Sequence, residues 1–320
     1  MHYKNGKRGI YMTHKQRAVA ALTLQVPDRV PTFELEFQLE DIMFGKSFLR
    51  MEDLKDESPK EREYLIKENA EYIVQVYEQL EHSIIPIHYL DTQSIKETAT
   101  YIRQLVGDEF MLTTHGDGTF AIPSGDEMVE FVYWLADSPD EVHEVATRMA
   151  DKAIERNKQL IDSGFDSFIL CSDYCYNSGP FLSPTMFREF IQPYLYKIIQ
   201  ETRRAGAYTI KHTDGNIMPI LDQLVECEPH AIHSLDPMAN VDIKEVKELI
   251  GDKVCLIGNV NCALMQTGTD EEVIESAEYC LTHAKPGGGY IFSTSNIPFN
   301  GLPVERYELI LDVWKRMRDY

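Results

Sequence analysis

The sequence lacks the features that mark several common classes of protein. No apolar stretch approaches the ~20 residues that a membrane-spanning helix needs, and the opening residues, MHYKNGKRGIYMTHKQRAVAAL, contain no apolar core of a signal peptide. Basic residues are in a clear minority, with 31 Lys and Arg against 52 Asp and Glu, so the net charge is -21. This charge argues against a nucleic-acid surface and against binding to an anionic membrane.

Paired cysteines are also missing. The six cysteines are scattered and form neither a CxxC pair nor the framework of a small disulfide-rich domain. Together with the missing signal peptide, this favours the reducing cytoplasm. No GxGxxG motif follows the first predicted strand, which weighs against a doubly wound dinucleotide-binding sheet.

An alternation of strand-like and helix-like segments runs along the chain. Apolar runs rich in β-branched or aromatic residues predict strands at 30–37, 83–88, 110–114, 166–172, 207–212, 230–235, 254–259 and 290–293. The clearest helical periods lie at 60–80, 139–163, 184–204, 243–250, 270–283 and 303–317. Eight such units predict an α/β protein, a single (β/α)8 TIM-type barrel with an N-terminal helical elaboration. With no linker to divide it, we expect residues 1–320 to form one domain.

Polar side chains gather where these strands end. The strand-end residues are Glu34, Glu36, His88, His115, Asp173, His212, Asp214, Asp236, Asn259, Ser293 and Ser295. In (β/α)8 barrels the active site lies at the carboxyl ends of the strands. Because buried polar groups cost free energy unless they have partners, so many of them at this end predict a functional site.

The segment KHTDGN holds the sharpest pair, His212 and Asp214. Two residues apart at a strand end, both side chains can emerge on one face. They could ligate a metal ion such as zinc, with a third ligand from another strand end. His212 could instead transfer a proton or bind a substrate. A purely structural alternative is that Asp214 caps the helix that follows and His212 packs.

Five segments of the chain resemble the uroporphyrinogen decarboxylase superfamily. They are HKQRAVAALTLQVPDRVPTFELEF, LSPTMFREFIQPYLYKII, IKHTDGN, LIGNVN and GGGYIFSTSNIPFNGLPVERYELILDVWK. The resemblance implies a distorted TIM barrel and one of two activities. The first is decarboxylation of a tetrapyrrole with eight carboxylates, which arginines after the first strand hold. The second is methyl transfer to or from a corrinoid protein, in which thiol-using members bind zinc through a His-x-Cys pair and use a late cysteine.

This sequence departs from both patterns. The arginine motif is replaced by FELEFQLED, whose carboxylates would repel an anionic substrate. Asp214 stands where the zinc-binding cysteine is expected, and the late segment FSTSNIPF contains no cysteine. Oxygen ligands would make a bound zinc ion a stronger Lewis acid, which favours a substrate with a methoxy group over a thiol.

The resemblance therefore implies a methyltransferase that moves a methyl group from a small methoxy compound to the corrinoid of a partner protein. Zinc would be held by His212, Asp214 and Glu36, with His212, Asp214 and Asp173 catalytic. The expected substrate contacts are Glu34, His115, Tyr176, Asn259 and Ser295. The expected partners also include a second copy of the chain in a homodimer. The alternatives are a decarboxylase of uroporphyrinogen or another acid, and a binding module without chemistry. A decarboxylase needs basic residues at the mouth, and the candidates Lys211 and Arg188 are expected to point outward.

Overall fold

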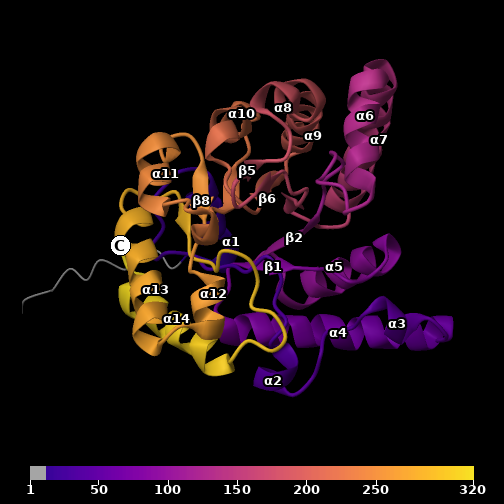
Figure 1. Ribbon diagram of the computed structural model, residues 1–320. Coiled ribbons are helices and arrows are strands. Elements are labelled where there is room, and N and C mark those ends of the chain that lie inside the picture. The colour runs from indigo at the N-terminus through magenta and orange to yellow at the C-terminus, as the bar shows by residue number, and fades with distance from the viewer. Residues whose placement is uncertain (1–11) are drawn as a thin grey trace, which may run out of the picture.

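A curled sheet of parallel strands forms the centre of the computed structural model, which describes residues 12–320 (Figure 1). The sheet order is β1-β2-β3-β6-β7-β8-β9, and every neighbouring pair is parallel. The strands are β1 (Ile84–Pro86), β2 (Met111–His115), β3 (Ser167–Leu170), β6 (Tyr208–Thr213), β7 (Ala231–Ser234), β8 (Cys255–Ile257) and β9 (Tyr290–Ile291). A separate two-stranded hairpin consists of β4 (Cys175–Tyr176) and β5 (Gly179–Pro180).

Helices surround this sheet, as expected for a (β/α)8 fold. The first seven are α1 (His14–Leu22), α2 (Glu40–Phe44), α3 (Met51–Leu54), α4 (Pro59–Leu80), α5 (Thr92–Val106), α6 (Glu127–Asp137) and α7 (Pro139–Ile161). The others are α8 (Pro184–Phe190), α9 (Gln192–Arg204), α10 (Leu221–Glu226), α11 (Ile243–Ile250), α12 (Cys262–Thr267), α13 (Asp270–Ala284) and α14 (Val304–Met317). Two short 3-10 turns, η1 (Met218–Ile220) and η2 (Pro237–Ala239), complete the structure.

The first predicted strand, 30–37, is not a regular strand, and this prediction was wrong. Only Thr32 forms an isolated parallel bridge, to Phe292 beyond β9. On the other side, the amide of Ser83 donates to the carbonyl of Thr32 over 2.8 Å, next to β1. The segment thus closes the barrel between β9 and β1. Because Pro31 has no N–H to donate, it interrupts a regular ladder here.

The predicted helix at 184–204 is two helices. α8 ends at Phe190 and α9 begins at Gln192, with Ile191 between them. Pro193 lies in the first turn of α9, where its missing N–H is tolerated, whereas inside one continuous helix it would clash with the preceding turn. The helix break therefore has a covalent cause that the apolar periodicity does not reveal.

Apolar residues pack in two layers, one on each face of the curled sheet. The interior of the barrel contains one side chain or two from each strand, including Ile84, Met111, Ile169, Ile210 and Ile257. The residues between them in sequence face the helices and form the larger core. Among residues 12–320, no helix is both long and apolar enough to cross a membrane.

Candidate functional site

Two groups of histidines and carboxylates lie at the carboxyl ends of the strands. Each group contains three side chains whose ligand atoms are all within 4.8 Å of one another. The first consists of Asp173, His212 and Asp214, and the second of Glu36, His88 and His115. The sequence placed all six at strand ends, but it assigned Glu36 to the first group. In the structure Asp173, on the loop after β3, stands beside His212 and Asp214 instead.

His212 is the buried member of the first group. It belongs to β6, and its Nε2 lies 3.7 Å from Asp214 Oδ1 and 3.9 Å from Asp173 Oδ1. The backbone N–H of Asp214 donates to Asp173 Oδ1 over 3.0 Å, which ties the two loops together. Burial, followed by the nearby His233, lowers the pKa of His212 well below its usual value. The imidazole is therefore neutral at pH 7.

A chain of buried hydrogen bonds sets the orientation of the His212 ring. Its Nδ1 lies 2.7 Å from Nδ1 of His233 on β7, and His233 Nε2 lies 3.3 Å from Ser293 Oγ. Ser293 in turn donates to Glu34. With Ser293 donating to Glu34, His233 donates from Nε2 and accepts at Nδ1, and in this arrangement His212 carries its hydrogen on Nδ1. This leaves the lone pair of His212 Nε2 directed at the two carboxylates.

Asp214 is positioned by hydrogen bonds from two other strand ends. Ser234 Oγ donates to its Oδ1 over 2.7 Å, and Asn296 Nδ2 donates to its Oδ2 over 2.5 Å. Burial raises the pKa of Asp214 to about 6, and the charges of Asp173 and Asp236 contribute. At pH 7 the carboxylate is still largely ionised. No local pattern in the sequence marks His233, Ser234 or Asn296 as partners, because they join the site only through strand register.

The first group has the donor set of a cation site. Neutral His212 offers a lone pair, and the two carboxylates offer oxygens, so these three atoms cannot donate hydrogen bonds to one another. In a tetrahedral zinc site with bonds of about 2.0–2.2 Å, neighbouring ligand atoms are about 3.5 Å apart. The observed 3.7 and 3.9 Å are close to this value. One nitrogen and two oxygens are ligands that zinc accepts, so these residues fit the ion that the resemblance implies.

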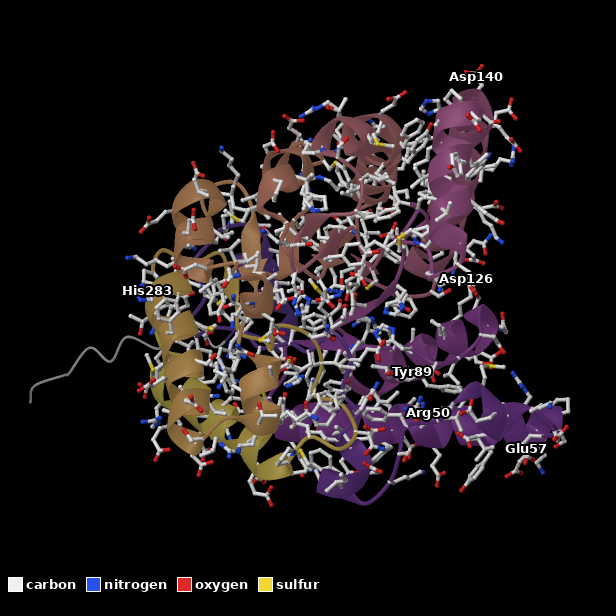
Figure 2. The ribbon with its side chains drawn as sticks, viewed as in Figure 1. Arg50, Glu57, Tyr89, Asp126, Asp140 and His283 are labelled. Carbon is white, nitrogen blue, oxygen red and sulfur yellow. The ribbon has the colours of Figure 1, made fainter. Side chains whose placement is uncertain are left out.

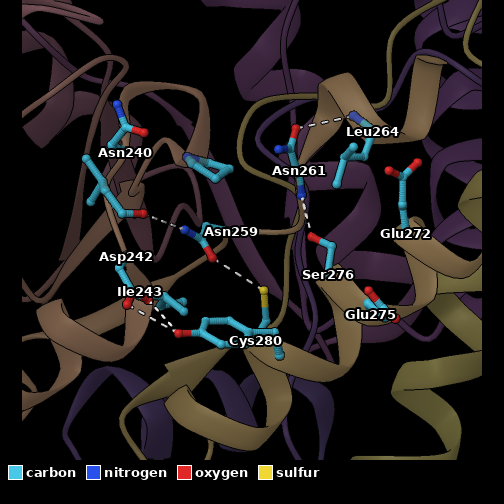
Figure 3. A pocket seen from close by; sticks show the side chains of 13 residues that line it. Asn240, Asp242, Ile243, Asn259, Asn261, Leu264, Glu272, Glu275, Ser276 and Cys280 are labelled. Atoms are coloured by element: carbon cyan, nitrogen blue, oxygen red, sulfur yellow. Dashed lines mark hydrogen bonds between the residues drawn. The ribbon is translucent and has the colours of Figure 1, made fainter. Parts of the chain in front are cut away.

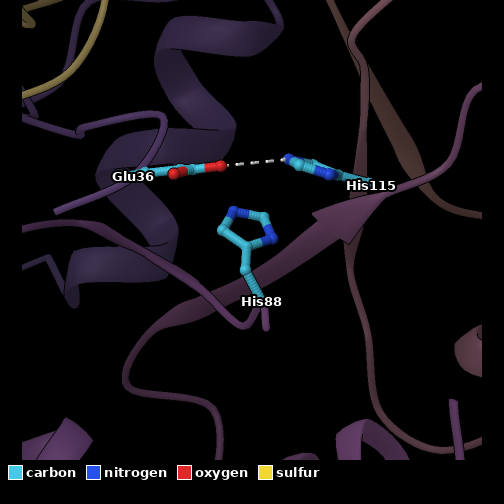
Figure 4. A group of neighbouring side chains, drawn as sticks. All are labelled: Glu36, His88 and His115. Carbon is cyan, nitrogen blue, oxygen red and sulfur yellow. Dashed lines mark ion pairs between the residues drawn. The ribbon is translucent and has the colours of Figure 1, made fainter. Parts of the chain in front are cut away.

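The second group comes from three neighbouring segments of the barrel (Figure 4). Glu36 belongs to the irregular first segment, His88 follows β1, and His115 is the last residue of β2. Glu36 Oε1 is 4.0 Å from His115 Nε2, and the rings of His88 and His115 have centroids 4.1 Å apart. Burial lowers the pKa of both histidines. The sequence named His115 as a substrate contact; its side chain is 44% exposed, which is compatible with a contact to a small molecule.

Glu34 is in the core, beneath the mouth. It is 1% exposed and accepts hydrogen bonds from Thr294, Ser293 and Tyr307. Burial raises its pKa to about 8, so the carboxyl is mostly protonated at pH 7. Its link to the site is the contact with Ser293 described above.

Three other expected substrate contacts lie in different surroundings. Asn259 hydrogen-bonds to Leu235, Val241 and Cys280 and lines a groove of about 560 Å³ between η2, α11, α12 and α13 (Figure 3). None of the six residues of the two groups lines that groove. Ser295 is buried, and its Oγ accepts from the amide of Cys262. Tyr176 is 42% exposed on the β4–β5 hairpin.

The two basic residues considered for a decarboxylase do not reach the mouth. Arg188 is half exposed and pairs with Glu226 on the outer surface. Lys211 points to the helix side of the sheet, as expected, but it is fully buried rather than solvated. Its Nζ lies 3.1 Å from Asp117 and donates to two backbone carbonyls.

The chain is similar to proteins of two activities. The family model "Uroporphyrinogen decarboxylase (URO-D)" matches residues 71–316. A methylcobamide:CoM methyltransferase of Methanosarcina barkeri is 22% identical over 169 residues, 52% of this chain and 48% of the relative. A uroporphyrinogen decarboxylase of Aromatoleum aromaticum is 22% identical over 248 residues, 73% of this chain and 66% of the relative.

A solved structure supports the fold. A methyltransferase from Methanosarcina mazei superposes with a TM-score of 0.70 at 16% identity, covering 96% of this chain and 99% of that one. The matches to the two curated relatives span only about half to two thirds of their lengths. The family model, by contrast, matches most of this chain, residues 71–316. The chain therefore belongs to the uroporphyrinogen decarboxylase family.

Proposed function

We propose that the protein transfers a methyl group from a small methoxy compound to a corrinoid protein, with zinc bound by Asp173, His212 and Asp214. The observation that carries the proposal is the convergence of one imidazole lone pair and two carboxylates at the barrel mouth. Asp173 takes the place that the sequence had given to Glu36. The similarity to a methylcobamide:CoM methyltransferase supports the reaction class.

Each residue of the site has a part in this reaction. A bound zinc ion would supply a Lewis acid for the ether oxygen of the substrate. His233 holds the His212 ring in one tautomer, and Ser234 and Asn296 hold the Asp214 carboxylate. In the transfer the C–O bond of the ether would break, the methyl group would pass as a cation equivalent to the cob(I)amide of the partner protein, and the oxygen, which keeps the bonding electrons, would leave as an alcohol after taking a proton from water. Asp173, about half exposed, is the member of the group that substrate meets first.

The alternative is decarboxylation of a carboxylic acid, and one observation favours it. The guanidinium of Arg156, on α7, reaches the backbone carbonyl of His115 and so lies close to the mouth. It is one cation near a mouth whose strand ends carry four carboxylates, those of Glu36, Asp173, Asp214 and Asp236. Because a substrate with many carboxylates needs several cations, we prefer methyl transfer.

The first experiment is the metal content of protein purified without a metal-affinity step, measured by elemental mass spectrometry after incubation with zinc. We expect His212→Ala and Asp214→Asn each to lose about one zinc per chain relative to wild type. The control is His143→Ala, which removes a histidine on α7 paired with Tyr194. A second assay follows methylation of cob(I)alamin by methoxy compounds in the same proteins. If wild type and both variants hold equal zinc, the proposed metal site is wrong.

A further inference from the structure

The group of Glu36, His88 and His115 has no part in the function proposed above. It draws its members from three consecutive segments of the barrel, and its three ligand atoms lie within 4.8 Å of one another (Figure 4). Two imidazoles and one carboxylate are a common ligand set for zinc and other divalent first-row metals. The question is whether each side chain is set to bind an ion or is satisfied without one.

His88 is fixed by a backbone contact. Its Nε2 lies 3.0 Å from the carbonyl oxygen of Leu35, which can only accept, so Nε2 carries the hydrogen. Burial lowers the pKa of His88, which keeps the ring neutral. The lone pair is therefore on Nδ1. A histidine that donates one ring N–H to a backbone carbonyl and offers the other nitrogen has the arrangement of most metal-bound histidines.

Glu36 is fixed in a similar way. Tyr89 Oη and Gln38 Nε2 both donate to Oε2, and Gln38 Nε2 also lies 3.1 Å from Tyr89 Oη. The guanidinium of Arg50 lies 4.2 Å above the Tyr89 ring and holds that side chain in turn (Figure 2). The hydrogen bonds engage Oε2 and leave Oε1, the oxygen nearer to His115, as the free ligand atom.

His115 supplies the unsatisfied atom. Its Nε2 is buried and has no hydrogen-bond partner, although Glu36 Oε1 is 4.0 Å away. A hydrogen bond between them would need a heavy-atom distance of about 3 Å. A buried nitrogen that misses an available carboxylate by this margin is unusual in a folded protein. An ion between the two groups would satisfy both.

We propose that Glu36 Oε1, His88 Nδ1 and His115 Nε2 bind a divalent first-row transition-metal ion, separately from Asp173, His212 and Asp214. Bonds of about 2.0–2.2 Å put neighbouring ligand atoms about 3.5 Å apart, so Glu36 Oε1 and His115 Nε2, which are 4.0 Å apart, must approach one another by about 0.5 Å. His115, with its partly exposed side chain, can make this movement. Three protein ligands leave a position open for water or an oxygen ligand from the mouth. The proposal does not depend on the function proposed above.

Cobalt(II) is the probe, because its visible absorption reports nitrogen and oxygen ligation directly. The titration uses the full chain in an Asp173→Asn, Asp214→Asn background, which disables the first group. We expect about one cobalt per chain in this background. Adding His115→Gln or Glu36→Gln should weaken binding at least tenfold and remove the visible bands. Tyr89→Phe, which frees Glu36 without removing a ligand, should weaken binding less.

The matched control is His283→Ala in the same background, which removes a histidine of α13 far from the mouth (Figure 2). It should bind cobalt like its parent. Circular dichroism checks that each variant is folded, and His115→Gln and Glu36→Gln test the site independently should one of them unfold. The proposal is overturned if the parent double variant binds no cobalt, or if neither His115→Gln nor Glu36→Gln changes the affinity.

Discussion

Glu34 in the core and Asp214 at the barrel mouth are two carboxylates whose pKa values are both raised, because burial disfavours the ionised form of each. The pKa is about 8 for Glu34 and about 6 for Asp214. At neutral pH Glu34 is therefore mostly protonated, whereas Asp214 is largely ionised. This difference suits a neutral core group for the first and a cation ligand for the second.

Glu34→Gln should make the protein less sensitive to rising pH. In the unfolded chain Glu34 ionises near pH 4.5, whereas in the fold it stays protonated to about pH 8. Between these values the folded state binds more protons, so this residue lowers the free energy of unfolding as pH rises, by at most about 1.4 kcal/mol per pH unit. Glutamine cannot ionise. Chemical denaturation between pH 5 and pH 8, covering about that window, should show a flatter profile for the variant.

The control for this measurement is Glu308→Gln, an exposed glutamate of α14. Its profile should follow wild type. A Glu34→Gln profile that falls with pH as steeply as wild type would show that Glu34 is already ionised in the fold, which would contradict its raised pKa.

At the residue scale, the sequence predicts which residues belong to the site better than it predicts which of them lie together. The spacing of His212 and Asp214 at the end of an apolar run was enough to bring both into one group. Asp173 was expected to be catalytic and lies beside them, while Glu36 joins His88 and His115. These pairings depend on how far each loop extends beyond its strand, and on a register between strands that no local pattern encodes.

At the scale of elements, the last helix stabilises the first barrel segment. Trp314 of α14 donates its Nε1–H to the carbonyl of Val30 over 3.0 Å, and Tyr307 of the same helix contacts Glu34. Both aromatic side chains are fully buried. Residues 31–33 make only two backbone hydrogen bonds to Phe292 on one side and one to Ser83 on the other, so this helix is needed to hold the segment in place.

Trp314→Phe should therefore destabilise the protein. The variant leaves the buried carbonyl of Val30 without this donor and leaves a small void, at a cost of about 1–3 kcal/mol. The chain offers a matched control in Trp134→Phe, because Trp134 of α6 donates to Glu141 in a solvent-exposed contact. Denaturant titration should show a clear loss for the first and little change for the second. Equal losses would argue that α14 has no special role in holding the segment.

The sequence located all eight barrel segments, but the one that α14 holds is not the regular strand that it predicted. The seven correct predictions overlap the strands, because long apolar runs between helices have few other solutions. Residues 30–37 also read as apolar and extended. Their irregular path follows from Pro31 and from contacts with residues more than 250 positions away, which a local pattern cannot report.

At the scale of the whole molecule, the charge of -21 and the mouth have the same sign. Four carboxylates follow the strands, those of Glu36, Asp173, Asp214 and Asp236. The charge of Lys211 is already paired with that of Asp117. A polyanionic ligand approaching this mouth meets repulsion from the site and from the protein as a whole. This property separates methyl transfer from the decarboxylation of a polycarboxylate.

Uroporphyrin, a stable tetrapyrrole with eight carboxylates, should therefore bind weakly, and its binding should strengthen as salt is added. Raising the ionic strength from 0.01 to 0.1 M shortens the screening length from about 30 Å to about 10 Å, which weakens repulsion between like charges. Fluorescence titration at several salt concentrations measures the effect. In Glu36→Gln with Asp173→Asn, the affinity at low salt should rise severalfold and the salt dependence should diminish. An affinity that falls as salt is added would instead reveal a cationic pocket, because salt also screens the attraction between a cationic pocket and an anionic ligand. Decarboxylation would then become the better proposal.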